Sequence, residues 1–242
     1  MSLPHFFLRE QVLAFESAPV FALHLDADDT KHAKVLRLAV GEHIAVVDAV
    51  SDYFECEIVS LEGDELSVSI AQKLSSYARP EVVLVQGLAK GEKMDTIVRH
   101  ATEVGIAEFV PMTTSRSVVK LDAKKSKARF ERWASIAKSA AMQSGRSSKP
   151  VVHAPCSVAG AVDIAKDCDA VLICWEEAEL SNTLAKAVSC CIATTGKDPR
   201  SLRIALVVGP EGGLTAQEVD LFLALPYAYS ISLGPSILRT ET

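Results

Sequence analysis

The residues best suited to chemistry lie in two glycine-containing stretches near the end of the 242-residue chain. The first, Gly209-Pro-Glu-Gly-Gly213, directly follows Ile204–Val208, an apolar run with the length and composition of a buried strand. Thr215 and Glu218 then have the spacing of a capping box, which predicts a helix over Ala216–Leu223. A strand, a glycine-rich turn and a helix in this order are typical of ligand sites in open α/β sheets. A plain strand-to-helix turn is the alternative.

The second stretch repeats this arrangement, because a short predicted strand over Tyr229–Leu233 breaks at Gly234-Pro235. Glycines allow the backbone to approach a ligand closely and tolerate positive φ angles. A phosphate-binding loop is not predicted, because no G-K-[ST] sequence follows and lysine is absent after Pro199. The two breaks therefore predict two backbone loops side by side, facing a ligand other than a simple phosphate.

Charge is distributed unevenly along the chain, whose formal net charge is −6. Residues 1–79 carry 6 Lys and Arg against 13 Asp and Glu, whereas residues 116–149 carry 10 against 2. An acidic chain with one strongly basic segment is typical of a protein that binds a polyanion on one face. The alternative is a helix whose charged face is simply solvated.

The composition excludes several classes of protein. No apolar run approaches the ~18 residues that a membrane span requires, and the first ten residues lack the features of a secretion signal. Six cysteines without a C-x-x-C pair indicate reduced thiols that mostly pack in the interior, so no zinc site is expected. These features predict a cytoplasmic protein without membrane contact.

The elements that must position the two loops fall into two regions. Residues 1 to about 75 predict a small β-rich domain, with strands over 43–50, 53–59 and 65–70 and a short helix over 29–41 that ends at glycine. After a linker at 75–80, strands alternate with helices, which predicts a parallel sheet. Its expected strands are 82–88, 108–112, 170–175, 203–208 and 229–233, and its expected helices are 93–104, 125–144, 157–166, 180–190 and 216–223.

Longer motifs in the chain resemble those of a known protein family. The sequence G-P-E-G-G, followed by L-G-P-x-I-L-R-T-E-T over Leu233–Thr242, resembles the RsmE family of the SPOUT superfamily. The pattern H-x-x-x-V-L-R-x-x-x-G over His32–Gly41 and the segment Lys90–Asp95 resemble the same family. Met142-Gln-Ser-Gly-Arg146 departs from the family's E-Q-S/C-G-R, since methionine replaces the usual glutamate. The resemblance covers most of the chain.

The resemblance implies a fold and an activity. The fold is α/β: a PUA-like β-barrel over residues 1–75 that helps to hold RNA, and a SPOUT methyltransferase domain over 76–242 with a parallel sheet and a trefoil knot. The activity is methylation of N3 of a uridine in 16S ribosomal RNA, with S-adenosyl-L-methionine as methyl donor. The enzyme would act on this RNA or on the small ribosomal subunit, as a homodimer.

In the family, a further alanine- and leucine-rich helix follows L-R-T-E-T, completes the knot and supplies much of the dimer contact. A chain ending at Thr242 is therefore expected to bind the cofactor poorly and to dimerise weakly.

The resemblance also implies three groups of site residues. Arg239 would stabilise the uridine anion, and Glu211 or Glu241 would accept the N3 proton, although Glu211 could equally hold its own loop. The residues expected to hold the cofactor are Cys174, Trp175, Glu176, Val208, Gly209, Pro210, Gly212, Gly213, Leu233, Gly234, Ile237 and Leu238. The residues expected to contact RNA are Arg9, Lys34, Arg37, Arg116, Lys124, Lys125 and Arg146.

Several of these side chains also have an alternative explanation in which they only stabilise the fold. His32 and Arg37 can equally serve only to cap and solvate their helix, and Lys93, Glu103, Arg116 and Arg146 can serve as surface ion pairs. Two other functions also stay open: a SPOUT enzyme that methylates a ribose 2′-hydroxyl, and a non-catalytic protein that binds the ribosome. Cofactor binding and a methyl-transfer assay distinguish them.

Overall fold

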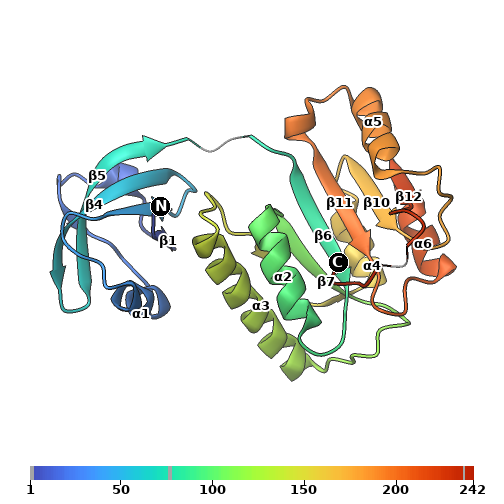
Figure 1. The fold of residues 1–242 in the computed structure, drawn as a ribbon, viewed down its shortest axis with the longest axis horizontal. Coiled ribbons are helices and arrows are strands. Elements are labelled where there is room, and N and C mark those ends of the chain that lie inside the picture. The colour runs from blue at the N-terminus through green and yellow to red at the C-terminus, as the bar shows by residue number, and fades with distance from the viewer. Residues whose placement is uncertain (1–2, 76–77, 237) are drawn as a thin grey trace. The chain divides into compact units, whose positions relative to one another are not determined.

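The computed structural model describes residues 3–75, 78–236 and 238–242 (Figure 1). Contacts divide the chain into two compact units, one of residues 1–77 with 139–149 and one of residues 78–138 with 150–242. The segment 139–149 thus packs with the first unit, although a boundary at residue 75 assigns it to the second. Part of the expected linker, residues 76 and 77, lies outside the described residues.

The first unit is built on a five-stranded sheet with the strand order β1-β3-β4-β5-β2. Strand β1 runs parallel to β3, and the other pairs are antiparallel. Alternate residues of β4 (Phe54, Cys56 and Ile58) point into the core, as expected for a sheet with one solvated face. The elements of this unit are β1 (His5–Phe7), η1 (Leu13–Phe15), β2 (Phe21–Ala22), α1 (Ala27–Leu36), β3 (His43–Val47), β4 (Tyr53–Glu62) and β5 (Glu65–Leu74).

Several predicted boundaries in this unit are wrong. Strands β4 and β5 continue to Glu62 and Leu74, beyond the predicted ends at residues 59 and 70, and α1 begins at Ala27 rather than at residue 29. Helix α1 ends at Leu36, well before Gly41, because Arg37 itself adopts the left-handed conformation (φ 55°) that closes the helix. Strand β3 stops at Val47 rather than at residue 50. The Asp48 carboxylate accepts hydrogen bonds from the backbone N–H groups of Val50 and Asp52, which stabilises a turn instead of a continued strand.

The second unit contains a wholly parallel sheet with the order β12-β10-β11-β6-β7-β8, and β9 also pairs with β7. Its strands are β6 (Glu81–Gly87), β7 (Glu108–Thr113), β8 (Val151–Val152), β9 (Cys156–Ser157), β10 (Ala170–Cys174), β11 (Arg203–Val208) and β12 (Ala228–Ile231). Its helices are α2 (Lys93–Val104), α3 (Ala123–Gln143), α4 (Val158–Ala165), α5 (Leu184–Thr195), η2 (Pro199–Ser201) and α6 (Ala216–Leu223), except that residues 139–143 at the end of α3 belong to the first unit. No helix in the described ranges is long and apolar enough to cross a membrane.

Helices cover both faces of this sheet, so the unit has three layers (Figure 1). Successive strand residues point to opposite faces. Val83 and Val85 of β6 pack with α4 and α6 on one face. Leu84 packs with α2 and α3 on the other face, where α5 also packs against Leu172 of β10. Burial on both faces explains the continuous apolar runs of the central strands.

Most predicted elements of the second unit are confirmed, and β11, α2 and α6 have the predicted bounds. The capping box at Thr215 and Glu218 is present in both directions. The helix expected over 180–190 instead begins at Leu184 and continues to Thr195, because the Thr183 hydroxyl caps its N-terminus. Strands β1, β2, β8 and β9 were not predicted, since two- and three-residue strands show no periodicity.

Replacing Glu218 by alanine should lower the free energy of unfolding by about 1–3 kcal/mol, because two backbone donors lose their partner. The buried carboxylate accepts hydrogen bonds from the N–H of Ser115 (2.7 Å) and of Thr215 (2.9 Å), and so joins the loop after β7 to α6. Urea denaturation of Glu218→Ala measures the loss. The exposed neighbour Gln217→Ala is the control, and equal midpoints for the two variants would contradict this role.

Candidate functional site

The two loops that follow β6 and β11 mark the place in the sheet where the chain changes direction. These strands are neighbours, but from β6 the chain continues to β7 on one side, and from β11 it passes over β10 to β12 on the other. Parallel sheets bind ligands outside the carboxyl ends of their strands at such a switch point. The loop Gly209–Leu214 after β11 is therefore in the position expected of a binding site, as its sequence predicted.

The side chain of Gln86, near the end of β6, joins three segments at this position. It is 1% exposed, and its amide nitrogen lies 2.9 Å from Oγ1 of Thr240 and 3.4 Å from the carbonyl oxygen of Gly209. The amide also donates to the carbonyl of Gly87, and the Thr240 hydroxyl donates to the Gly209 carbonyl at 2.7 Å. The C-terminal segment is thereby held against both loops.

A second contact between these segments is ionic. The Lys93 ammonium, in the first turn of α2, lies 3.1 Å from Oε1 of Glu211 and 3.2 Å from Oε2 of Glu241. The backbone N–H of Lys90 also donates to Glu211 at 3.1 Å. Arg239 lies 4.0 Å from Glu241, with its side chain 83% exposed. Of these four charged groups, the guanidinium of Arg239 is the one most open to solvent.

These contacts change the acidity of both carboxyls. Burial raises the pKa of Glu211, but hydrogen bonds from its own backbone N–H, from Lys90 and from Lys93 outweigh burial and hold the pKa below 4.5. For Glu241, the hydrogen bond from its own backbone N–H is the main cause of a lowered pKa, and Lys93 and Arg239 add to it. The pKa of Lys93 is raised by Glu211 first and Glu241 second. All three groups are therefore charged at neutral pH.

The Gly209–Leu214 loop is held from its other side by Arg116. The guanidinium donates to the carbonyls of Gly212 (2.9 Å) and Leu214 (3.2 Å), and it lies 3.9 Å from the Glu176 carboxylate. Both backbone bonds are charge-assisted and hence stronger than ordinary ones. Arg116, predicted to contact RNA, is thus engaged with the loop.

The glycines of this loop are required by neighbouring protein atoms. A Cβ on Gly213, whose φ is +70°, would lie 2.3 Å from the Glu176 carboxylate, and one on Gly212 would lie 3.1 Å from Cβ of Arg116. At Gly209 a Cβ would lie 2.9 Å from the backbone of Gly213. A side chain at position 212 or 213 would therefore strike Arg116 or Glu176.

The other predicted cofactor residues surround the same loops. Cys174 ends β10, and burial raises the pKa of its thiol to about 11, so it is inert as a nucleophile. The indole N–H of Trp175 is buried and has no hydrogen-bond acceptor in the described part of the chain. Leu233 and Leu238 are 54% and 46% exposed, and a Cβ on Gly234 (φ +109°) would meet nothing within 4 Å. Ile237 lies outside the described residues.

The remaining predicted RNA contacts belong to different parts of the chain. In the first unit, Arg9 is paired with Asp26 at 2.9 Å and Lys34 with Asp64, and the exposed Arg37 closes α1. Arg146 belongs to the same unit. In the second unit, Lys125 is paired with Asp122 at 3.3 Å, whereas Lys124 is exposed.

Sequence reasoning missed Gln86 and Thr240 as members of the site, and it left Lys93 as a surface ion pair. A signal for Gln86 exists, since a single amide at the end of the apolar run Val82–Val85 must find hydrogen-bond partners when it is buried. Thr240 lies within the family-like L-R-T-E-T motif, but its partners are far away in sequence.

Comparisons with known proteins define the class to which this architecture belongs. A family model described as an RNA methyltransferase domain matches residues 77–242, and one described as an RNA methyltransferase PUA domain matches residues 25–71. A protein of Bacillus subtilis (strain 168) named ribosomal RNA small subunit methyltransferase E is 34% identical over 230 residues, covering 94% of this chain and 87% of that protein. The chain belongs to the ribosomal RNA small subunit methyltransferase E family, and the predicted family is confirmed.

Two solved structures share the whole architecture. A ribosomal RNA small subunit methyltransferase E from Neisseria gonorrhoeae, bound to S-adenosyl methionine, is 25% identical with a TM-score of 0.77, covering 99% of this chain and 92% of that one. A methyltransferase from Legionella pneumophila, in complex with the cofactor SAM, is 25% identical with a TM-score of 0.77, covering 100% and 93%. The predicted combination of a PUA-like domain with a parallel-sheet methyltransferase domain is confirmed.

Replacing Gly213 by alanine should destabilise the protein more than the same change at Gly196. Both residues have a positive φ (+70° and +64°), which costs a non-glycine residue about 1–2 kcal/mol, but only Gly213 faces a neighbouring atom. Urea denaturation measures the difference. Removing the carboxylate with Glu176→Ala should recover part of the loss in the double variant. Equal losses at the two glycines would show that Glu176 does not limit this position.

Replacing Lys93 by methionine should weaken the dependence of stability on pH in acid solution. Since the pKa of each carboxyl is lowered in the folded state, their attraction to Lys93 is complete above pH 4.5 and is lost as the pH falls through the folded pKa values. As the pH is lowered from neutral to the folded pKa values of the two carboxyls, the free energy of unfolding should therefore fall less steeply for Lys93→Met than for the parent. Lys186→Met, at an exposed site on α5, is the control, and identical slopes for the Lys93 variant and the parent would contradict the ionic contact.

Proposed function

We propose that this protein methylates N3 of a uridine in the 16S RNA of the small ribosomal subunit, with S-adenosyl-L-methionine as the methyl donor. The observation that carries the proposal is the meeting of three segments at the switch point of the sheet, through Gln86, Gly209 and Thr240. The names of its relatives and the cofactor bound in two structural neighbours support the same activity.

The residues around these loops fit the proposed cofactor. Leu233 and Leu238 expose apolar surface in the segment that contains Gly234, where a Cβ would meet nothing within 4 Å, and exposed apolar surface of this kind suits an adenine ring. The unpaired indole N–H of Trp175 can donate to a polar atom of a ligand. We therefore assign the backbone from Val208 to Gly213, the end of β10 with Glu176, and the Leu233–Leu238 segment to the cofactor site. When bound, the sulfonium group supplies an electrophilic methyl group.

The chain itself must then orient the base and move one proton. Uracil N3 carries a hydrogen and is paired in a duplex, so the target must be unpaired before it reacts. We assign Arg239 to stabilising the negative charge that develops on the base, because its guanidinium is exposed beside the C-terminal loop. Holding the base in line and excluding water account for the rest of the catalytic effect.

The two candidate proton acceptors differ in their contacts. Both carboxylates pair with Lys93, but Glu211 also accepts a hydrogen bond from the Lys90 N–H, so we assign Glu211 to holding its loop. Glu241 lies beside Arg239, and we assign it as the acceptor of the N3 proton. Because its pKa is lowered, Glu241 is a weak base, so removal of the N3 proton depends more strongly on the stabilisation of the negative charge by Arg239.

The proposal includes an assembly and a location. We expect a homodimer and a trefoil knot at the C-terminal segment, as the family resemblance implies, and a cytoplasmic location, where ribosomal subunits are assembled. The return of Thr240 from the edge strand β12 across β10 to Gly209 is compatible with a knotted path. Light scattering tests the dimer.

Incubation with tritiated S-adenosyl-L-methionine and either free small-subunit RNA or whole subunits tests the reaction, and mass spectrometry of the digested RNA identifies the product. The proposal predicts 3-methyluridine. A 2′-O-methylated nucleoside would instead support the ribose methyltransferase, and RNA binding without transfer would support a non-catalytic ribosome-binding protein.

In the same assay, Arg239→Met should reduce the rate of transfer by about 10²-fold, the usual effect of removing one group that stabilises developing charge. Its affinity for S-adenosyl-L-methionine, measured by calorimetry, should stay within about twofold of the parent. Arg200→Met, at an exposed site in η2, is the control. An unchanged rate for Arg239→Met would remove this residue from the mechanism.

A further inference from the structure

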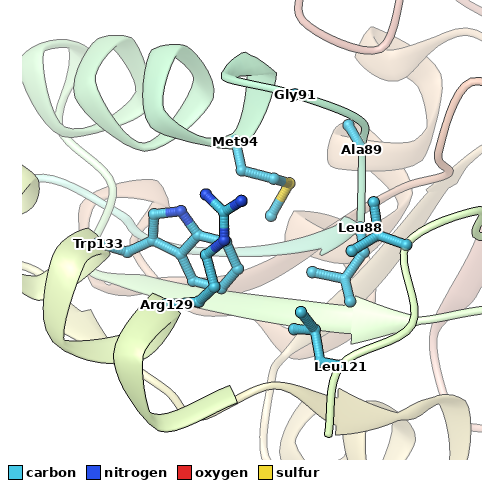
Figure 2. A pocket seen from close by; sticks show the side chains of 8 residues that line it. Leu88, Ala89, Gly91, Met94, Leu121, Arg129 and Trp133 are labelled. Carbon is cyan, nitrogen blue, oxygen red and sulfur yellow. The ribbon is translucent and has the colours of Figure 1, made fainter. Parts of the chain in front are cut away.

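A shallow apolar depression lies next to the proposed cofactor loops, between the loop after β6 and the start of α3 (Figure 2). Its floor contains Leu88, Met94, Leu121 and Trp133, and Figure 2 shows the Arg129 guanidinium between the Trp133 ring and Met94 in this view. The volume of about 20 Å³ holds little more than one water molecule. A larger ligand would therefore lie across the mouth of the depression.

Three cations belong to the segments that form this depression. Arg129 lines it directly, Lys90 lies between the lining residues Ala89 and Gly91, and Lys120 lies between Val119 and Leu121. Lys90 and Lys120 are exposed, and Arg129 is half-buried. Within the ranges that the structure describes, none of their side chains makes an ion pair or hydrogen bond.

Other cations of the basic segment 116–149 are already engaged. Lys125 is paired with Asp122, and Lys127 lies 4.0 Å from Glu131. Arg132 binds the buried Asp95, which also accepts from the Trp133 indole at 3.1 Å. Among the described residues, the structure thus separates these paired cations from unpaired ones, which are Lys90, Lys120 and Arg129 at the depression and Lys124 in the first turn of α3.

The depression is connected to the proposed active site through Lys90. The backbone N–H of this residue donates to Glu211, and the next turn of chain leads to Lys93, which binds Glu211 and Glu241. The backbone at Lys90, which borders the depression, is thus joined to the loop Gly209–Leu214 through Glu211. Glu241 in turn lies 4.0 Å from Arg239, so a chain of contacts connects the loop after β6 to Arg239.

We propose that Lys90, Lys120 and Arg129 form a subsite for one nucleotide of single-stranded RNA adjacent to the methylated residue. The two lysines bind phosphate groups, and the base stacks on the guanidinium of Arg129 over the apolar floor. Unpaired cations beside an apolar or planar surface are the usual features of a site for single-stranded nucleic acid. This subsite rests on the proposed function, because it serves the same RNA substrate.

The double variant Lys120→Gln/Arg129→Gln tests the subsite with a short fluorescein-labelled single-stranded oligoribonucleotide. Its affinity at about 0.1 M salt should fall at least about tenfold, and the slope of log K against log salt should decrease by about 0.7 for each phosphate that the variant no longer binds. The affinity for S-adenosyl-L-methionine should not change. Lys186→Gln/Arg200→Gln removes the same charge from exposed, unpaired cations elsewhere in the described part of the second unit and should have little effect.

Equal RNA affinity and salt slope for the two double variants would overturn the subsite. Methyl transfer by the parent protein, measured in parallel, separates this result from a failure of the proposed function. Transfer by the parent together with unchanged RNA binding by Lys120→Gln/Arg129→Gln would reject the subsite alone. Weakened RNA binding in that variant without transfer by the parent would support the RNA surface and reject the proposed reaction.

Discussion

The buried amide of Gln86 is the group on which the arrangement of the site depends. It lies at the carboxyl end of a central strand and is closed to solvent, so an N–H without an acceptor would cost about 1–3 kcal/mol. One acceptor is the carbonyl of the adjacent Gly87, and the others come from Gly209 and Thr240, which are 123 and 154 residues away in sequence. The bonds to Gly209 and Thr240 thus hold the loop after β11 and the C-terminal segment together beside β6.

Some of the charged groups around this amide hold the loops in place, and others remain exposed and available to a substrate. Lys93 neutralises Glu211 and Glu241, and Arg116 binds the carbonyls of the glycine-containing loop. Arg239 stays exposed. Rigid placement of a binding loop by neighbouring side chains is a general requirement for catalysis by orientation. The same division recurs at the depression beside α3, where the engaged cations stabilise the helix and the unpaired ones face solvent.

The sequence allowed the prediction of those parts that carry local signals. The buried apolar run of β11 and the capping box at Thr215 predicted the central strand and α6 at their observed bounds. The partners of Gln86 were not predictable in this way, because no local pattern specifies a contact over 154 residues. Counting charges located the basic segment but could not show that Lys125 is paired while Arg129 is not. Likewise, glycine-rich spacing indicated a site, whereas only the structure shows that Glu176 excludes a side chain at Gly213.

The proposed S-adenosyl-L-methionine site consists of the loop Gly209–Leu214, the end of β10 with Glu176 and the C-terminal segment, and Gln86 holds the first and the last of these together. Hydrogen–deuterium exchange of the protein with and without this cofactor tests it most directly, because amide protection locates binding without altering the chain. We expect the cofactor to increase amide protection together in the loop Gly209–Leu214, at the end of β10 with Glu176, and in the segment from Leu233 to Glu241. Protection confined to other regions, while calorimetry registers binding, would contradict it.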